Sequence, residues 1–77
     1  MDQKFKQIIA DVLECSVDQI NESNTMQNTE SWDSLKHMEL VTALEQNYDI
    51  ELPLTEMMEM TSIEGIIRVL ETKGVQC

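Results

Sequence analysis

Basic residues are scarce in this 77-residue chain. Five Lys and Arg stand against fifteen Asp and Glu, which gives a formal net charge of −10. Without a run of Lys or Arg, the chain has too few positive charges to neutralise the phosphates of a nucleic acid. The same deficit disfavours binding to an anionic membrane surface. The composition therefore favours proteins with basic patches, or divalent cations, as partners.

Glycine and proline are also rare, with two Gly and one Pro in the whole chain. Loop-rich and all-β folds use more of both residues at their turns, so we expect an all-α fold. The length allows a single domain, residues 1–77, with a thin core, because so short a chain buries only roughly 60–65% of its surface. We expect residues 74–77 to form a frayed tail.

Cysteines and apolar runs are too few for a disulfide-rich or membrane-spanning protein. Cys15 and Cys77 cannot form a disulfide framework, and neither has a neighbouring Cys or His at metal-ligand spacing. The longest apolar run is Ile8-Ile9-Ala10, far below the roughly 18 residues of a membrane span. The N-terminal residues lack the layout of a signal peptide, which favours the cytoplasm.

Apolar residues recur with helical spacing in the first half of the chain. The first helix is predicted from about Asp2 to Glu14. The second is predicted to begin at Asp33-Ser34, with Asp33 as its N-cap, and to end near Asn47.

The second half of the chain predicts two more helices. A short one over residues 56–60 follows Thr55, whose hydroxyl can cap it. A longer one begins with a capping box formed by Thr61 and Glu64 and ends at Gly74. The sequence thus predicts three major helices plus one short helix.

A long polar connection separates the first two predicted helices. Over residues 16–32, only Val17, Ile20, Met26 and Trp32 can attach it to a core. We expect Trp32 to be buried, as a large indole usually is. Connections of this length in compact domains often have a function.

Acidic residues are concentrated in the middle of the chain. Residues 30–64 hold nine of the fifteen acids and one base, Lys36. Charge alone allows two interpretations: a solvated face that keeps the protein in solution, or a recognition surface for basic partners.

The segment Glu30-Ser31-Trp32-Asp33-Ser34-Leu35 places a serine just inside a predicted helix start. A phosphate ester at this serine would be stabilised by free backbone N–H groups and by the helix dipole. Taken alone, Asp-Ser-Leu occurs by chance too often to identify such a site, and an ordinary helix cap explains it better.

The wider pattern resembles acyl carrier proteins over essentially the whole chain. Asp-Ser-Leu is followed by Met38-Glu39-Leu40-Val41, Ala43-Leu44-Glu45, Tyr48-Asp49 and Leu52-Pro53. The resemblance implies a small bundle of three major helices plus one short helix, with a long first loop. It also implies that Ser34 carries 4′-phosphopantetheine, attached from coenzyme A by a phosphopantetheinyl transferase.

The thiol of that arm would hold an acyl group as a thioester for enzymes of fatty-acid, polyketide or specialised pathways. The resemblance implies a monomer that catalyses nothing itself. Its partners would be the transferase and acyl- or aminoacyl-activating and acyl-transferring enzymes with basic docking patches.

Two sets of residues follow from the same resemblance. The implied docking residues are Asp33, Leu35, Lys36, Met38, Glu39, Glu45 and Glu56. The implied acyl pocket is lined by Met38, Leu44, Leu52, Met57, Met60, Ile66 and Ile67. Met57 and Ile66 are often smaller in fatty-acid carriers, so we expect a shorter pocket, with small or polar cargo kept outside the core.

The attachment segment departs from fatty-acid carriers, which usually have a small residue before Asp-Ser-Leu and an acid after it. Here Trp32 precedes it, and Lys36-His37 follow. This form looks more like specialised carriers. We expect His37 to be a solvated surface residue, because no orienting acid is evident for a nucleophile–base pair with Ser34.

Two alternatives remain at this stage. Within the family, the chain would be an aminoacyl or peptidyl carrier. Outside it, the chain would be an acidic helical adaptor or regulatory binding protein, with Ser34 as a plain cap. No EF-hand spacing supports a calcium-responsive protein.

Overall fold

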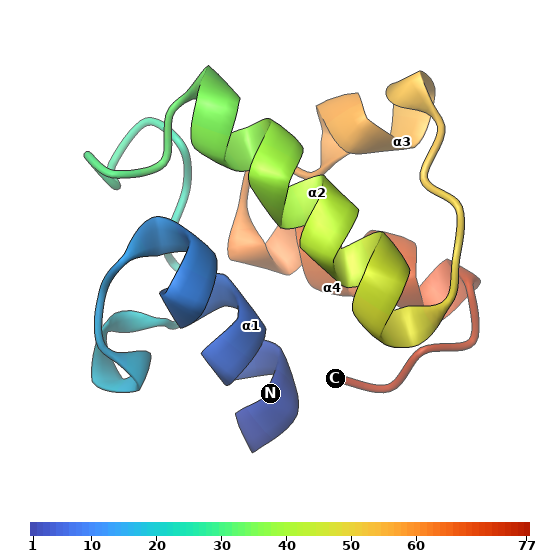
Figure 1. Ribbon diagram of the computed structural model, residues 1–77, viewed down its shortest axis with the longest axis horizontal. Coiled ribbons are helices and arrows are strands. Elements are labelled where there is room, and N and C mark those ends of the chain that lie inside the picture. The colour runs from blue at the N-terminus through green and yellow to red at the C-terminus, as the bar shows by residue number, and fades with distance from the viewer.

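The computed structural model describes residues 1–77 and contains only helices and loops (Figure 1). The helices are α1 (Gln3–Leu13), the single 3₁₀ turn η1 (Val17–Gln19), α2 (Ser34–Tyr48), α3 (Leu54–Glu59) and α4 (Ile63–Thr72). The prediction of an all-α fold with three major helices and one short one is confirmed. No helix has both the length and the apolar content required to span a bilayer.

Aspartates cap the first two α-helices: Asp33 as predicted, and Asp2, for which no cap was predicted. The Asp2 carboxylate accepts a hydrogen bond from the Phe5 N–H at 2.8 Å, and Asp33 accepts one from the Lys36 N–H at 2.9 Å. Each satisfies a backbone donor that the helix itself leaves free. Both helices end at an acidic residue with positive φ, Glu14 at 57° and Asp49 at 53°.

The other two α-helices begin at residues that the sequence analysis did not identify. α3 begins at Leu54, directly after Pro53, without a side-chain cap, so the prediction of a Thr55 cap is wrong. Proline before a helix already has a suitable φ and lacks an N–H to satisfy.

At α4 the N-cap is Ser62, whose hydroxyl accepts from the Gly65 N–H at 2.9 Å, so the predicted Thr61 capping box is also wrong. The main chain of Thr61 is hydrogen-bonded to the long loop. Its carbonyl accepts from the Met26 N–H at 2.9 Å, beside an isolated antiparallel bridge between Thr25 and Ser62.

The long loop between α1 and α2 is fixed at several points. Ile20 and Trp32 are buried, and Val17 and Met26 are half-buried against the core. The Ile63 N–H also donates to the Asn24 carbonyl at 3.0 Å. The loop is thereby joined to the α3–α4 junction as well as to its own ends.

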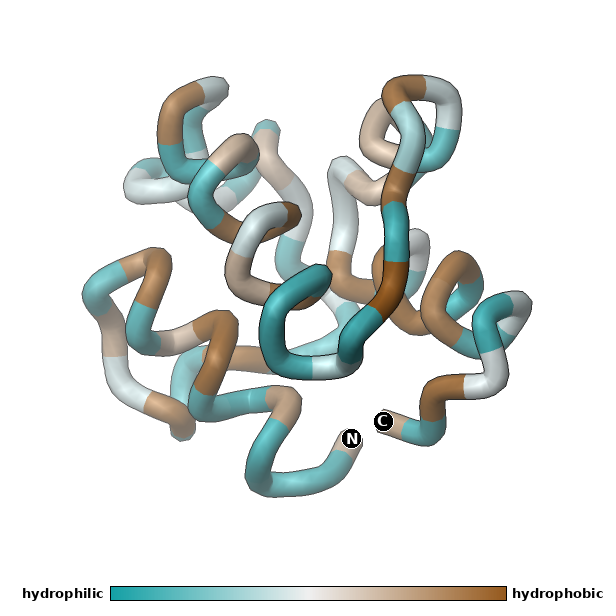
Figure 2. The backbone as a smooth tube through the Cα atoms, turned by 45° about the vertical axis from the view of Figure 1, so that its right-hand side comes forward, coloured by the Kyte–Doolittle hydropathy of each residue, from teal (hydrophilic) through white to brown (hydrophobic).

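Sixteen buried hydrophobic residues form one core between the helices. In Figure 1, α2 crosses α4, α1 packs to one side, and α3 lies beside the first part of α2. In Figure 2 the apolar, brown stretches of backbone concentrate toward the middle of the molecule. The larger buried side chains each contribute about 1.5–3 kcal/mol by leaving water.

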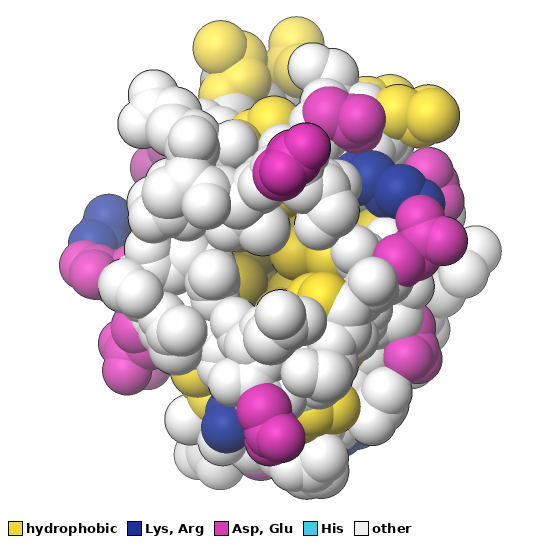
Figure 3. Space-filling view, turned by 90° about the vertical axis from the view of Figure 1, so that its left-hand side faces the viewer, with side chains coloured by type: hydrophobic (Ala, Val, Ile, Leu, Met, Phe, Trp, Pro, Cys, Tyr) yellow, Lys and Arg dark blue, Asp and Glu magenta, His cyan; other side chains and the backbone are white.

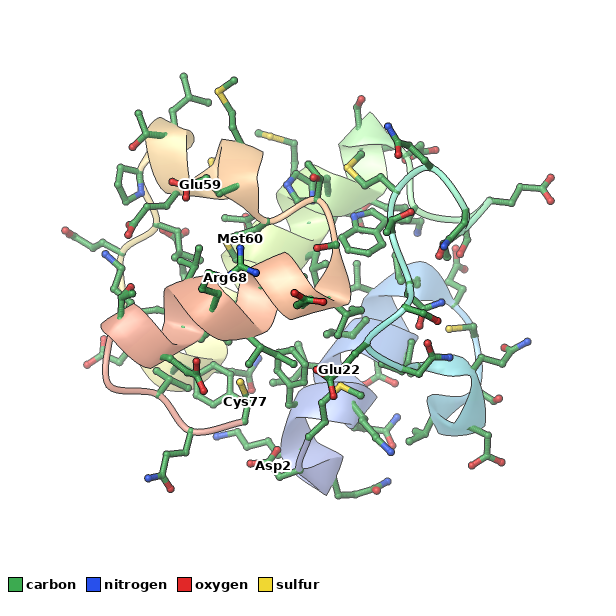
Figure 4. The ribbon with its side chains drawn as sticks, turned by 180° about the vertical axis from the view of Figure 1, so that it is seen from behind. Asp2, Glu22, Glu59, Met60, Arg68 and Cys77 are labelled. Carbon is green, nitrogen blue, oxygen red and sulfur yellow. The ribbon has the colours of Figure 1, made fainter.

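The chain ends are joined rather than loose. The Asp2 N–H donates to the Cys77 carbonyl at 2.6 Å, and Figure 4 shows the two residues side by side. The prediction of a frayed tail over residues 74–77 is therefore wrong. Gly74, with φ of 79°, turns the chain after α4, and the apolar Val75 and Cys77 then pack against the core.

Gly65 permits a close approach of α4 to α3. A Cβ atom at this position would lie 2.5 Å from the Glu59 carbonyl oxygen. Gly65→Ala should therefore lower the melting temperature, because overpacking costs about 1–3 kcal/mol and outweighs the gain of about 1 kcal/mol in helix propensity. Thermal unfolding followed by circular dichroism checks this, with the exposed Glu71→Ala as control. An unchanged or higher melting temperature for Gly65→Ala would contradict the close packing.

Candidate functional site

Ser34 is the first residue of α2 and is exposed. None of the side-chain hydrogen bonds involves its hydroxyl. The Asp33 carboxylate accepts a hydrogen bond from the Lys36 N–H, and the Asp33 carbonyl accepts one from the His37 N–H at 2.9 Å. The N–H groups of Ser34 and Leu35 remain free at the positive end of a 15-residue helix. An oxyanion esterified to Ser34 would lie next to these donors.

A histidine bridge joins the loop, α2 and α3 directly behind this serine. Trp32, only 1% exposed, donates from Nε1 to His37 Nδ1 at 3.1 Å. His37 Nε2 lies 2.9 Å from the Met57 carbonyl, and the imidazole donates there because Nδ1 is used as the acceptor. We call Trp32, His37 and the Met57 carbonyl the His37 bridge.

The bridge confirms that Trp32 is buried and corrects the expectation for His37. His37 is half-buried with both ring nitrogens engaged, and it is not a solvated surface residue. Its lone pair is directed at the indole N–H. His37 therefore has no free lone pair with which to accept a proton from the Ser34 hydroxyl.

Lys36 does not present a free positive charge, as a docking residue would. Its ammonium lies 2.9 Å from the Glu14 carboxylate at the end of α1, and its side chain is only 23% exposed. The hydrogen bond that Lys36 donates and its positive charge lower the pKa of Glu14, and the hydrogen bond to Glu14 raises the pKa of Lys36. Whatever this exposed pair contributes to stability is present at neutral pH and is lost as acidification protonates Glu14.

The acidic residues implied for docking divide into two groups. Glu39 is exposed without a partner, and Asp33 is exposed although it caps α2. Glu45 instead accepts from the Leu52 N–H at 2.8 Å and fixes the segment before α3. Glu56 is paired with Lys73 at 2.7 Å, and both side chains are mostly covered. Glu45 and Glu56 thus have structural partners that the sequence analysis did not foresee.

Four large hydrophobic side chains are exposed at the end of the molecule where α2 begins. They are Leu35, Met38, Leu54 and Met58, each 57–69% exposed. We call them the apolar rim. The His37 bridge holds α3 beside the start of α2, and Figure 3 shows hydrophobic side chains gathered at that end. Leu54 and Met58, one helical turn apart, were not identified from the sequence.

Comparison with known proteins identifies the family. The family described as "Phosphopantetheine attachment site" matches residues 3–70. The chain belongs to this family. It is a family of carrier proteins whose prosthetic group is 4′-phosphopantetheine, and the curated relatives of this chain are named acyl carrier proteins.

Curated relatives of this carrier include specialised types. Polyketide-8 synthase acyl carrier protein 1 of Streptomyces avermitilis is 29% identical over 88% of the chain and 81% of the relative. Acyl carrier protein 2 of the same synthase is 27% identical, over 92% and 82%. An acyl carrier protein of Wolinella succinogenes is 28% identical, over 88% and 90%. These names agree with a carrier of specialised type.

The residues implied for an acyl pocket are packed against one another. Leu44, Met60 and Ile66 are 0% exposed, and Leu52 is 4% exposed. The other two interior residues, Met57 and Ile67, are half-buried against the same core. Figure 4 shows Met60 between α3 and α4.

None of the cavities in the structure lies among these core residues. Leu52 borders a shallow surface depression beside Pro53, and Met38 borders another on α2. Met38 is 57% exposed, so its prediction as an interior pocket residue is wrong, because it points outward at the start of α2. The expectation that cargo stays outside the core is still a prediction.

Replacing His37 should destabilise the fold. His37→Ala leaves the buried Trp32 N–H without a partner and removes one of the two donors to the Met57 carbonyl, which keeps the Met60 N–H. The unpaired indole N–H should cost about 1–3 kcal/mol. Urea unfolding followed by circular dichroism measures the loss, with the exposed Gln46→Ala in the same helix as control. Combined with Trp32→Phe, the double-mutant cycle should give a coupling energy of about 0.5–3 kcal/mol. Strictly additive effects would show that the indole–imidazole bond contributes nothing.

Proposed function

We propose that the Ser34 hydroxyl is the attachment point for 4′-phosphopantetheine, and that the chain carries an acyl group as a thioester on the thiol of that arm. The observation that carries the proposal is the exposed hydroxyl of Ser34, without a hydrogen bond, at the start of α2 in a chain of this family. In the attachment step, which a separate transferase catalyses, Ser34 Oγ forms a phosphoester with the pantetheine-bearing phosphate of coenzyme A and gives up its proton. The pyrophosphate bond of coenzyme A breaks, and adenosine 3′,5′-bisphosphate leaves.

The residues around Ser34 hold it in position. Asp33 fixes the first turn of α2, and the His37 bridge fixes the loop before it and α3 beside it. The free N–H groups of Ser34 and Leu35 are available to the phosphate. The arm itself supplies the thiol chemistry, and this chain binds and orients the arm.

The apolar rim and the unpaired acid next to it support a docking surface around Ser34. Leu35 supplies an exposed apolar anchor, and Glu39 supplies an exposed charge one turn along α2. Exposed charges accelerate encounters with basic partners without strongly slowing their release. This combination suits a carrier that must visit several enzymes.

The names of the relatives favour a carrier that serves a specialised pathway, polyketide synthesis above all. Two of them are named as polyketide synthase carriers. The residues at which this chain departs from fatty-acid carriers each form a hydrogen bond or an ion pair in the structure. Trp32 and His37 form the bridge, and Lys36 binds Glu14.

The proposed attachment is tested by modification of purified protein. Incubation with coenzyme A and a transferase of broad specificity should add one phosphopantetheinyl mass to the wild type and none to Ser34→Ala. Ser34 is exposed without a hydrogen bond, so its substitution should change stability by no more than about 0.5 kcal/mol. Ser31→Ala, also exposed, is the matched control and should be modified normally. Modification of Ser34→Ala, or none of the wild type, would refute the proposal.

The docking surface is tested by the rate of the same reaction at low carrier concentration. Glu39→Lys should slow modification about tenfold at low salt, with the difference shrinking as salt is added. Glu71→Lys changes the net charge equally but lies on α4, away from Ser34, and should have a much smaller effect. Equal effects of the two variants would show that only net charge matters.

A further inference from the structure

The largest hollow in the molecule lies between the end of α1 and the long loop, outside the residues described above. It is an open groove of about 780 Å³. Cys15 and Ile20 are its hydrophobic lining residues, and most of the others are uncharged and polar. Figure 3 shows a hollow on this face, with a hydrophobic bottom and a largely uncharged rim.

The polar wall of the groove is held in place by its own hydrogen bonds. Asn24 Nδ2 donates to Thr29 Oγ1 at 3.4 Å, and Thr29 Oγ1 donates to Asn28 Oδ1 at 2.9 Å. Asn28 Nδ2 donates to the Ser23 carbonyl at 2.9 Å. A wall that is already ordered loses little entropy when a ligand binds.

Some polar groups of the groove remain free for a ligand. Gln19 uses its side-chain oxygen to accept from the Ser16 N–H at 3.1 Å, and its amide NH₂ has no partner. None of the side-chain hydrogen bonds involves the Ser31 hydroxyl. The groove thus combines a free amide donor and a hydroxyl with the apolar surface of Cys15 and Ile20.

The groove lies close to Ser34. Ser31, on its rim, precedes Ser34 in the same short segment. On the other side, the ion pair of Glu14 with Lys36 holds the end of α1, and with it Cys15, beside the first turn of α2. A flexible group attached to Ser34 can therefore enter the groove without any movement of the helices.

We propose that this groove binds the amide-containing part of the phosphopantetheine arm, with the thiol end of the arm near Cys15; this rests on the proposed attachment at Ser34. Between its phosphate and its thiol, the arm has amide groups that both donate and accept, separated by short apolar segments. These match the free groups and the floor of the groove. The packed interior leaves no cavity among the core helices as an alternative.

Cys15 can lie beside a thioester without attacking it. Burial raises the pKa of its thiol above the ordinary value. The thiol therefore remains protonated at neutral pH, and the thiol form is a poor nucleophile. An acyl group held here would not be lost to this cysteine.

Disulfide trapping tests the proposal. In a Cys77→Ser background, the only thiols of the phosphopantetheinylated protein are Cys15 and the arm. Diamide, which takes up two electrons and two protons as two thiols join, should link them within the monomer. Mass spectrometry under non-reducing conditions should show the loss of two hydrogens, a crosslinked peptide containing Cys15, and reversal by dithiothreitol.

A matched variant distinguishes binding of the arm in the groove from the mere ability of a flexible arm to reach a cysteine. In Cys15→Ser/Cys77→Ser/Thr42→Cys, the added thiol is exposed on α2 and is closer to Ser34 along the chain. Each linking rate is divided by the rate at which the same cysteine, in the protein without the arm, links to free pantetheine, which corrects for the raised pKa of Cys15. After this correction the folded protein should link the arm to Cys15 about tenfold faster than to the cysteine at position 42, because the groove raises the local thiol concentration. In urea this preference should vanish, because the shorter loop then closes more readily.

An equal or slower corrected rate for Cys15 in the folded protein would overturn the groove proposal alone, since the arm must already be attached for the experiment to proceed. Failure to attach the arm would instead refute the proposed function. Amide spectra give a second readout. Attachment of the arm should shift the side-chain NH₂ signals of Gln19 and Asn24, whereas shifts confined to residues 33–38 would contradict binding in the groove.

Discussion

One imidazole holds together the end of the molecule where Ser34 is exposed. His37 accepts from the indole of Trp32 and donates to the Met57 carbonyl, so that a loop, a long helix and a short helix meet at one side chain. A buried indole N–H without an acceptor would be costly, so the burial of Trp32 and the position of α3 depend on the same residue. The apolar rim exists as one surface because this bridge keeps α3 beside the start of α2.

The large negative charge is used in two different ways. Part of it is structural: Glu14 binds Lys36, Glu56 binds Lys73, and Glu45 binds the Leu52 N–H. These contacts join neighbouring elements and offset some of the repulsion in a chain of net charge −10. Other exposed acids, such as Glu39, have no hydrogen-bond or ion-pair partner within the chain. Counting acids along the sequence does not separate the two uses, because the separation depends on which carboxylates find a donor in the fold.

Helical periodicity is local, and it was predictable. The approximate boundaries of α1 and α2, the Asp33 cap and the burial of Trp32 all follow from nearby residues, whereas the caps of α3 and α4 were predicted wrongly. What could not be predicted depends on distant main-chain atoms. The carbonyl bound by His37 lies in α3, and the Thr61 carbonyl, just before the Ser62 cap of α4, accepts from the Met26 N–H of the long loop.

The candidate site was predictable to a similar extent. A serine just inside the start of α2 was evident from the sequence, and so was an apolar residue after it. The groove beside α1 was not, because its wall is built from Asn and Thr side chains that read only as a polar loop until their mutual hydrogen bonds are known. Nor does residue type reveal whether space remains between packed side chains such as Leu44 and Ile66.

The indole of the His37 bridge is the only one in the chain. Its emission therefore originates entirely from the boundary between the loop and the helix that begins at Ser34, with no background from elsewhere. Because the emission of an indole depends on its surroundings, this carrier contains a natural optical reporter of the end of the molecule where α2 begins. Events at that end can be followed in solution without any added dye.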